Sequence, residues 1–345
     1  MTSSGPHTAT LAAAPHAQLI QMGTAYWVSK ILYATAKLGL ADQIAAEPKS
    51  AAELAGPLGV HAPSLHRLMR TLASLGILTE DTERRFSLTV MGEALKTGAP
   101  GSARSTLLSF CSPWFTRGFD NIMHSLQTGR SGFEEAHGKP VFDYIGQFPE
   151  EAALLSEAMN GFHGEEPPQV AAAYDFSPFK TIVDVGGATG NMLSAILTRH
   201  PGPRGILFDM AHVVTDAPEF LKSKHIAQRV TIERGNFFQS VPAGGDAYVL
   251  SHIIHDWSED QCLTILSNVR NAMKPDGSLL IVEMVLPDGD EPHPGKILDI
   301  VMLVMPGGQE RTKAEYATLL EKAGFKLTRI VPTNSAVSVV EAKLA

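Results

Sequence analysis

The sequence predicts an α/β protein in two parts: a mostly helical domain, followed by a parallel sheet with helices on both faces. The chain has 345 residues, 44% of them hydrophobic, which is enough apolar material for two cores. From Phe179 onward, short runs rich in β-branched residues alternate with helical segments, the pattern of a parallel sheet. Before Phe179, apolar residues recur mainly at helical spacing.

The N-terminal part carries the signals of a winged helix. Residues 1–18 lack periodicity and are expected to form a disordered tail, with order beginning near Leu19. Apolar spacing predicts two helices before Ser50, which can cap a third helix. A helix starting at Pro63 then precedes an alternating, hairpin-like segment. This order predicts a winged-helix-like dimerisation domain over residues 19–100.

A winged helix can also read DNA, so a transcription regulator is a hypothesis from another class. The formal net charge of −8 and the pI near 5.9 provide no excess of cations for phosphates. The candidate recognition helix carries only His66, Arg67 and Arg70 as basic residues. These observations favour a dimerisation module and no nucleic-acid partner.

Two further segments follow the N-terminal domain. Residues 101–176 are predicted to be mostly helical, with one helix starting near Pro149, and to form a connector that contributes to a ligand pocket. Residues 177–345 are predicted to form the sheet domain. Its expected strands are TIVDVGG, GILFDM, VTIERGNFF, AYVLSHIIHDW, SLLIVEMVL and a final pair, FKLTRIVP and AVSVVEAKL.

Cysteine usage and hydropathy indicate the setting of the protein. Cys111 and Cys262 lie far apart and outside any CxxC or Cys/His motif, so neither a disulfide framework nor a metal site is expected. Any activity is therefore expected to survive chelation. The N-terminus lacks a basic leader region, and no apolar run reaches membrane-spanning length. A cytoplasmic protein without a membrane partner is the expectation.

A glycine-rich turn, TIVDVGGATGN, is the most informative local feature. Glycines let the backbone approach a ligand, and the following helix offers free N–H groups to an anion. A dinucleotide fingerprint would need glycines where Ala188 and Asn191 stand. The run instead resembles the acid-x-Gly-x-Gly-x-Gly motif of class I S-adenosylmethionine-dependent methyltransferases, with Asp184 as the acid and Ala188 as the one departure. A tight turn without a ligand is the alternative.

Polar residues follow the predicted strands, where ligands of such sheets bind. Asp209 lies about 20 residues beyond the glycine turn, the distance at which an acid can accept hydrogen bonds from ribose hydroxyls. As an alternative, it could cap a helix. Asn236 follows the third strand, His255 the fourth and Glu283 the fifth. We therefore expect these side chains to gather at one edge of the sheet.

With these motifs in place, residues 20–345 resemble the caffeic acid and isoflavone type of plant O-methyltransferases and their bacterial small-molecule relatives, such as the acetylserotonin and hydroxyneurosporene types. The most specific pieces are DVGGATG, HDWSEDQC, MKPDGSLLIVE and PGGQERT. The resemblance implies a Rossmann-like methyltransferase sheet, S-adenosyl-L-methionine as cofactor, S-adenosyl-L-homocysteine as its product, and a homodimer. It also implies methyl transfer to a hydroxyl of a phenolic or other aromatic small molecule.

The resemblance also implies roles for individual residues. His255 corresponds to the general base, with Glu310 and Glu283 as the acids beside it. Where the family usually has Asp and plant members a Lys, this chain has Asn236 and Ser251. The expected cofactor contacts are Asp184, Gly186, Gly187, Gly190, Asp209, Met210, Gly235, Asn236, Phe237 and Ser251. The expected acceptor contacts are Phe142, Met159, Phe162, His252, Asp256, Met302 and Met305.

Each role has a structural alternative. His255 could cap the next helix, Glu310 could pair with Arg311, and the apolar acceptor contacts could be plain core. With a phenol pKa of about 10 and a free histidine pKa of about 6.5, complete proton transfer before attack would be uphill by roughly 5 kcal/mol. An acid on the far imidazole nitrogen would stabilise the imidazolium. N-methylation and non-methylating chemistry on the same fold are further alternatives.

Overall fold

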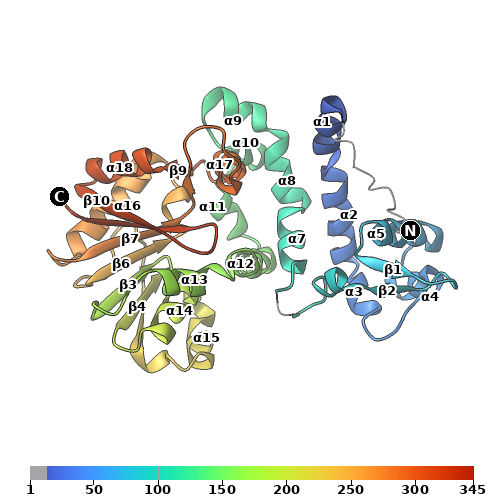
Figure 1. The fold of residues 1–345 in the computed structure, drawn as a ribbon, viewed down its shortest axis with the longest axis horizontal. Coiled ribbons are helices and arrows are strands. Elements are labelled where there is room, and N and C mark those ends of the chain that lie inside the picture. Colours follow the sequence, from blue (N-terminus) through green and yellow to red (C-terminus); the bar gives the residue numbers. More distant parts are fainter. Residues whose placement is uncertain (1–13, 100) are drawn as a thin grey trace, which may run out of the picture. The chain divides into compact units, whose positions relative to one another are not determined.

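The computed structural model describes residues 14–99 and 101–345, which fold as parts of two compact units (Figure 1). The first, called the N-terminal unit, comprises the chain up to Pro113 together with Ala153–Phe162. The second, called the sheet unit, comprises Trp114–Ala152 and His163–Ala345. Most of the expected tail, residues 1–13, lies outside the described residues. Order begins earlier than Leu19, because the first helix starts at Pro15.

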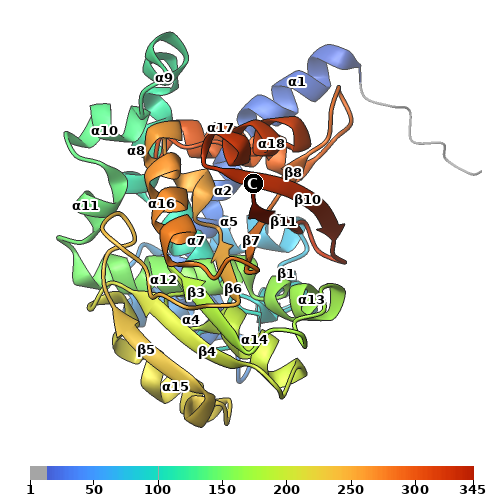
Figure 2. The same ribbon diagram turned by 90° about the vertical axis from the view of Figure 1, so that its left-hand side faces the viewer.

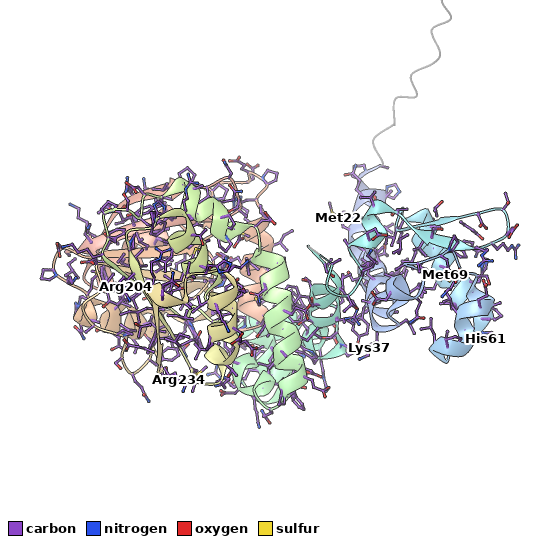
Figure 3. The ribbon with its side chains drawn as sticks, turned by 90° about the horizontal axis from the view of Figure 1, so that it is seen from below. Met22, Lys37, His61, Met69, Arg204 and Arg234 are labelled. Atoms are coloured by element: carbon purple, nitrogen blue, oxygen red, sulfur yellow. The ribbon has the colours of Figure 1, made fainter. Side chains whose placement is uncertain are left out.

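In the N-terminal unit, α4 (Ala51–Leu58) and α5 (Ala62–Ser74) precede a hairpin, the predicted order of elements, but the segment before Ser50 forms three helices rather than the two expected. Ser50 forms a capping box with Glu53 at the start of α4, and α5 has a proline in its first turn. Leu65 and Met69, the latter marked in Figure 3, are buried on α5 and pack in a core with Phe86 of the hairpin. The elements are α1 (Pro15–Thr24), α2 (Tyr26–Lys37), α3 (Leu40–Gln43), α4 (Ala51–Leu58), α5 (Ala62–Ser74), β1 (Leu78–Glu80), β2 (Phe86–Leu88), α6 (Val90–Glu93) and α7 (Arg104–Phe110).

From α13 on, helices and strands alternate in the sheet unit; α8 to α12 belong to it as well, except for Pro113 of α8 and Ala153–Phe162 of α12, which are part of the N-terminal unit. The helices are α8 (Pro113–Asp120), α9 (Ile122–Thr128), α10 (Gly132–His137), α11 (Val141–Ile145), α12 (Pro149–His163), α13 (Glu166–Ala173), α14 (Asn191–Arg199), α15 (Ala217–Ser223), α16 (Glu259–Ala272), α17 (Pro294–Val304) and α18 (Lys313–Lys322). The strands are β3 (Thr181–Val185), β4 (Arg204–Asp209), β5 (Val230–Arg234), β6 (Ala247–Ser251), β7 (Ser278–Glu283), β8 (Val285–Leu286), β9 (Arg311–Thr312), β10 (Phe325–Pro332) and β11 (Ser338–Leu344). Short 3-10 turns, η1 to η3, lie between some of them.

The main sheet has seven strands in the order β10-β11-β7-β6-β3-β4-β5 (Figures 1 and 2). Strands β7, β6, β3, β4 and β5 run parallel, which confirms the predicted Rossmann-like sheet. The C-terminal pair joins it antiparallel, with β11 beside β7 and β10 at the edge. A separate parallel pair, β8 and β9, was not predicted because each strand has only two residues.

Helices cover both faces of the sheet. Consecutive residues of β3, such as Ile182 and Val183, point to opposite faces of the sheet and belong to two different buried clusters. One cluster includes residues of α13, α14 and α15, and the other residues of α16 and α18 (Figure 1). The parallel strands therefore bring their carboxyl ends together at one edge. No helix in the described ranges is long and apolar enough to cross a membrane.

Candidate active site

The glycine turn between β3 and α14 has no room for side chains at Gly186 and Gly187. A Cβ on Gly186, where φ is +73°, would lie 2.4 Å from Ile253 Cδ1. A Cβ on Gly187 would lie 2.5 Å from Asp184 Oδ2. Gly190 has a φ of +90°, in the left-handed region that favours glycine. The turn therefore presents bare backbone at the carboxyl end of β3.

Asp209 at the end of β4 binds the glycine turn. Its Oδ2 accepts a hydrogen bond from Ala188 N at 3.0 Å, and its Oδ1 accepts one from Met210 N at 2.7 Å. No side-chain cap is present on the 3-10 turn Val213–Asp216 that follows, so the alternative of a helix cap is wrong. Asp209 thus joins the ends of β3 and β4 at the point where the resemblance places ribose.

Asp184 is a buried carboxyl group directly below this turn. Within the described part of the chain, neither of its oxygens has a hydrogen-bond partner of good geometry, although the Leu193 N–H lies close enough to lower the pKa somewhat. Burial raises the pKa of Asp184 to about 7, and the negative charge of Asp209 contributes in the same direction. A partnerless buried carboxyl beside bare backbone is what a bound polar ligand or water would satisfy. The glycine turn, Asp184 and Asp209 therefore fit an adenosyl cofactor with an amino acid moiety.

The turn after β5 is also closely packed. A Cβ on Gly235 would lie 2.6 Å from Phe208 Cε2. Asn236 Oδ1 accepts a hydrogen bond from Phe238 N at 2.9 Å, so this carbonyl is already engaged within its own turn. Asn268 Nδ2 donates to Phe237 O at 2.8 Å and anchors the turn to α16. Of the other expected cofactor contacts, Met210 is 41% exposed and Ser251 ends β6, half-buried.

His255 lies in the 3-10 turn that follows β6 and is buried. Its Nδ1 is 2.5 Å from Glu310 Oε1, and its Nε2 is 3.7 Å from Asp256 Oδ1. Its backbone is fixed on both sides, because His255 N donates to Glu283 Oε1 and His255 O accepts from Gln309 N at 2.8 Å. The imidazole and the main chain of this residue are therefore held by different acids.

The two acids have partners of their own. Tyr316 Oη donates a hydrogen bond to Glu283 Oε2. Glu310 N donates to Asp299 Oδ1 at 2.9 Å, which fixes the backbone of Glu310. Both glutamates are almost fully buried. Glu283 therefore positions the main chain of His255, and Glu310 is the acid that contacts its ring.

The PGGQERT segment packs closely against His255. A Cβ on Gly308 would lie 1.9 Å from His255 O, so only glycine fits there without a backbone shift. Arg311 donates to Ile254 O at 3.3 Å and to Gln309 O at 3.1 Å. No ion pair between Arg311 and Glu310 is present among the described residues, contrary to that alternative. The HDW and PGGQERT segments, which carry the resemblance, thus pack against each other.

The acids around His255 change its protonation. Burial alone would lower the pKa of His255, but Asp256, Glu310 and Glu283 outweigh this effect and raise it to about 10. Burial raises the pKa of Asp256 to about 6. His255 is therefore a much stronger base than a free histidine.

The expected acceptor contacts lie in several places. The ring of Phe142 on α11 is 41% exposed and lies 5.3 Å from the ring of Trp257, next to the HDW run. Met305 packs in a core with Phe133, and Met302 is buried on α17. Two others, Met159 and Phe162, are exposed on the part of α12 that belongs to the N-terminal unit.

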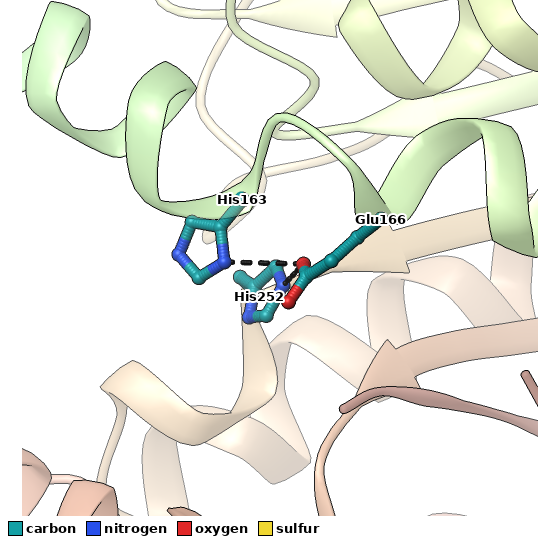
Figure 4. Close-up of side chains that lie close together, drawn as sticks. All are labelled: His163, Glu166 and His252. Carbon is teal, nitrogen blue, oxygen red and sulfur yellow. Dashed lines mark hydrogen bonds and ion pairs between the residues drawn. The ribbon is translucent and has the colours of Figure 1, made fainter. Parts of the chain in front are cut away.

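His252 belongs to a cluster that the sequence analysis missed (Figure 4). Glu166 Oε2 lies 2.7 Å from His252 Nε2 and 3.1 Å from His163 Nδ1. Burial raises the pKa of Glu166, but hydrogen bonds from the two histidines outweigh it and bring the value to about 2. The His-x-x-Glu spacing of His163 and Glu166 was the available signal; nothing in the sequence linked it to His252.

A Rossmann-like sheet with this glycine turn and Asp209 beside it defines a class I S-adenosylmethionine-dependent methyltransferase. The chain belongs to the O-methyltransferase family: the model of the O-methyltransferase domain matches residues 119–326, and that of the O-methyltransferase dimerisation domain matches residues 20–98. It is thus an enzyme of the EC 2.1.1 class. The cofactor of the family is S-adenosylmethionine.

Similar proteins include O- and N-methyltransferases. A phenazine O-methyltransferase of Lysobacter antibioticus is 44% identical over 94% of this chain and 95% of its own. A phenazine-1-carboxylate N-methyltransferase of Pseudomonas aeruginosa is 33% identical over 91% and 92%. The crystal structure of LaPhzM superposes with a TM-score of 0.92, at 43% identity over 96% of this chain and 100% of that one.

A second solved structure contains ligands. It is an O-methyltransferase from neocarzinostatin biosynthesis in complex with S-adenosylmethionine and 2-hydroxy-5-methyl naphthoic acid. Its TM-score is 0.81 at 31% identity, over 92% of this chain and 96% of that one.

Proposed function

We propose that this protein transfers a methyl group from S-adenosylmethionine to a hydroxyl of an aromatic small molecule, with His255 as general base. The observation that carries the proposal is the buried contact of 2.5 Å between His255 Nδ1 and Glu310 Oε1. It fixes the ring and leaves Nε2 as the nitrogen that can take a proton from the acceptor. The hydroxylated naphthoate in a similar structure supports an aromatic acceptor.

The raised pKa of His255 brings it close to the pKa of a phenol. A free histidine, with a pKa of about 6.5, would take a phenol proton uphill by roughly 5 kcal/mol. With the pKa of His255 near 10, the proton transfer is close to balanced. The cost is that His255 must first lose its own proton at neutral pH. The positive charge of the sulfonium favours that loss when the cofactor binds beside it.

The cofactor supplies an electrophilic methyl group, and this chain supplies the contacts that hold and orient it. The carboxylate of Asp209 would accept hydrogen bonds from the ribose hydroxyls, and the bare turn at Gly186 and Gly187 would lie against the amino acid moiety. Asn236 would act differently from the family's Asp. Its carbonyl, which already accepts from Phe238 N, keeps a second lone pair for the adenine amine, but an amide is a weaker acceptor than a carboxylate.

The proposal is tested by activity and by binding. Purified protein with S-adenosylmethionine and a panel of phenols, naphthols and hydroxylated phenazines should give a product heavier by one methyl. His255→Ala should lower turnover by about 10²- to 10⁴-fold while cofactor binding, measured by calorimetry, is retained. Near-normal turnover in His255→Ala would remove His255 as the base. Methylation of amines alone would favour the N-methyltransferase alternative.

We also propose that the N-terminal unit forms a homodimer. Large apolar side chains of α1 and α2 are between 57% and 73% exposed, more than expected for a free surface. They are Leu19, Ile20, Met22, Tyr26 and Trp27. The match of residues 20–98 to the dimerisation domain supports a second copy of this chain as the group that covers them.

A further inference from the structure

The cluster of His163, Glu166 and His252 lies within the sheet unit, at the ends of α12 and β6 and the start of α13 (Figure 4). His163 is the last residue of α12, Glu166 is the first of α13, and His252 directly follows β6. One ligand atom from each of the three residues lies within 4.8 Å of the other two. The segments thus bring together two imidazole nitrogens and a carboxylate oxygen.

We propose that His163, Glu166 and His252 form a binding site for a divalent transition-metal ion, with Zn²⁺ as the best fit. Two imidazoles and one carboxylate are a donor set that Zn²⁺ uses when it keeps a further position open for water or another ligand. The donors are borderline in softness, which favours Zn²⁺ over Mg²⁺ or Ca²⁺. The site does not rest on the proposed function.

The distances fit a shared ion. Zn–N and Zn–O bonds of about 2.0–2.2 Å at a tetrahedral angle place neighbouring donors about 3.3–3.5 Å apart. The observed separations from Glu166 Oε2, 2.7 Å to His252 Nε2 and 3.1 Å to His163 Nδ1, need to widen by less than 1 Å. Both nitrogens are aimed at the same oxygen, and the ring centroids of the two histidines are 3.8 Å apart. The third separation, between the two imidazole nitrogens, is no more than 4.8 Å.

The backbone holds His252 in this position. Its φ of +54° lies in the left-handed region, which costs a non-glycine residue about 1–3 kcal/mol. Glu166 is buried, although it is a carboxylate with a charge to satisfy. Strained backbone and a buried charge converge on the three donor atoms.

The test is metal binding by the untagged full-length protein after EDTA treatment and removal of the chelator. Titration with Zn²⁺ followed by calorimetry should show one ion per chain, and Co²⁺ should give the strong visible absorption of a tetrahedral site. His163→Gln, Glu166→Gln and His252→Asn should each weaken Zn²⁺ binding by at least about 10-fold. Asn is chosen at residue 252 because it tolerates the left-handed backbone.

The matched control is His124→Gln. His124 Nδ1 lies 3.8 Å from Glu135 Oε2, so it also pairs with a carboxylate, but it belongs to no three-donor group among the described residues. Its variant should bind Zn²⁺ as the unmodified protein does, and circular dichroism should show that all four variants are folded. No stoichiometric Zn²⁺ binding, or equal binding by the unmodified protein and the three site variants, would overturn the proposal and leave a hydrogen-bonded His–Glu–His cluster.

Discussion

At the scale of single residues, Glu310 and Glu283 divide the support of His255 between them. Glu310 contacts the imidazole, whereas Glu283 accepts a hydrogen bond from the backbone N–H. The sequence alone could not separate these roles, since Glu283 ends a strand and Glu310 stands in the PGGQERT run, and neither pattern says which part of His255 the acid contacts.

Glu310→Gln should reduce kcat and move the pH profile. In the unmodified enzyme, kcat/KM should rise with pH, because only neutral His255 can accept a proton. The charges of Asp256 and Glu310 raise the pKa of His255, so removing the Glu310 charge lowers it. The rising limb should therefore shift to lower pH, and kcat should fall by about 10²-fold.

The measurement is kcat/KM between about pH 6 and pH 10, made where the variant stays folded at each pH. Glu291→Gln, an exposed change away from the site, should leave the profile unaltered. An unshifted limb in Glu310→Gln would show that the profile does not report His255.

Elements in the structure show why some contacts could be predicted and others could not. The strands, the Ser50 cap and the gathering of Asp209 and His255 followed from local patterns that the sheet converts into proximity. The antiparallel placement of β11 beside β7 did not, because strand order depends on packing across the whole sheet. The contact between His163 and His252 could not be predicted either, because it depends on tertiary structure alone.

At the glycine turn, Ala188→Gly should stabilise the protein. Ala188 has a φ of +49°, a conformation that costs an L-residue about 1–2 kcal/mol. Against this, glycine gives the unfolded chain about 0.4–1 kcal/mol of extra entropy. The free energy of unfolding in urea should therefore rise by about 0.5–1 kcal/mol. Ala195→Gly, the same change inside α14, should lower it by about 1 kcal/mol.

In the PGGQERT segment, Gly308→Ala should disrupt the active site. The added methyl would lie 1.9 Å from His255 O, so the segment must move away from His255. We expect a loss of about 1–3 kcal/mol in unfolding free energy and a large loss of turnover. Gly202→Ala, where a Cβ meets nothing within 4 Å, is the control. Normal turnover in Gly308→Ala would contradict the tight packing described for this segment.

At the scale of the whole molecule, the exposed apolar residues of α1 and α2 predict concentration-dependent assembly. Trp27→Asp should weaken the proposed dimer by about 30-fold or more, since buried aromatic anchors contribute about 2 kcal/mol or more to such interfaces. Sedimentation velocity across a dilution series is the measurement. Met123→Asp, at an exposed apolar residue of α9 in the sheet unit, should leave the assembly unchanged.

The two hydrogen bonds that hold the His255 main chain separate the segments of this enzyme that can be substituted from those that cannot. Glu283 and Gln309 hold that backbone from within the sheet unit, independently of Phe142 on α11. Under the proposed function, with Phe142 as an acceptor contact and His255 as the base, substitutions at Phe142 are therefore expected to alter which aromatic ring is accepted without moving His255. For an engineer, this makes α11 the place to diversify in a library, and the HDW and PGGQERT segments the part to leave intact.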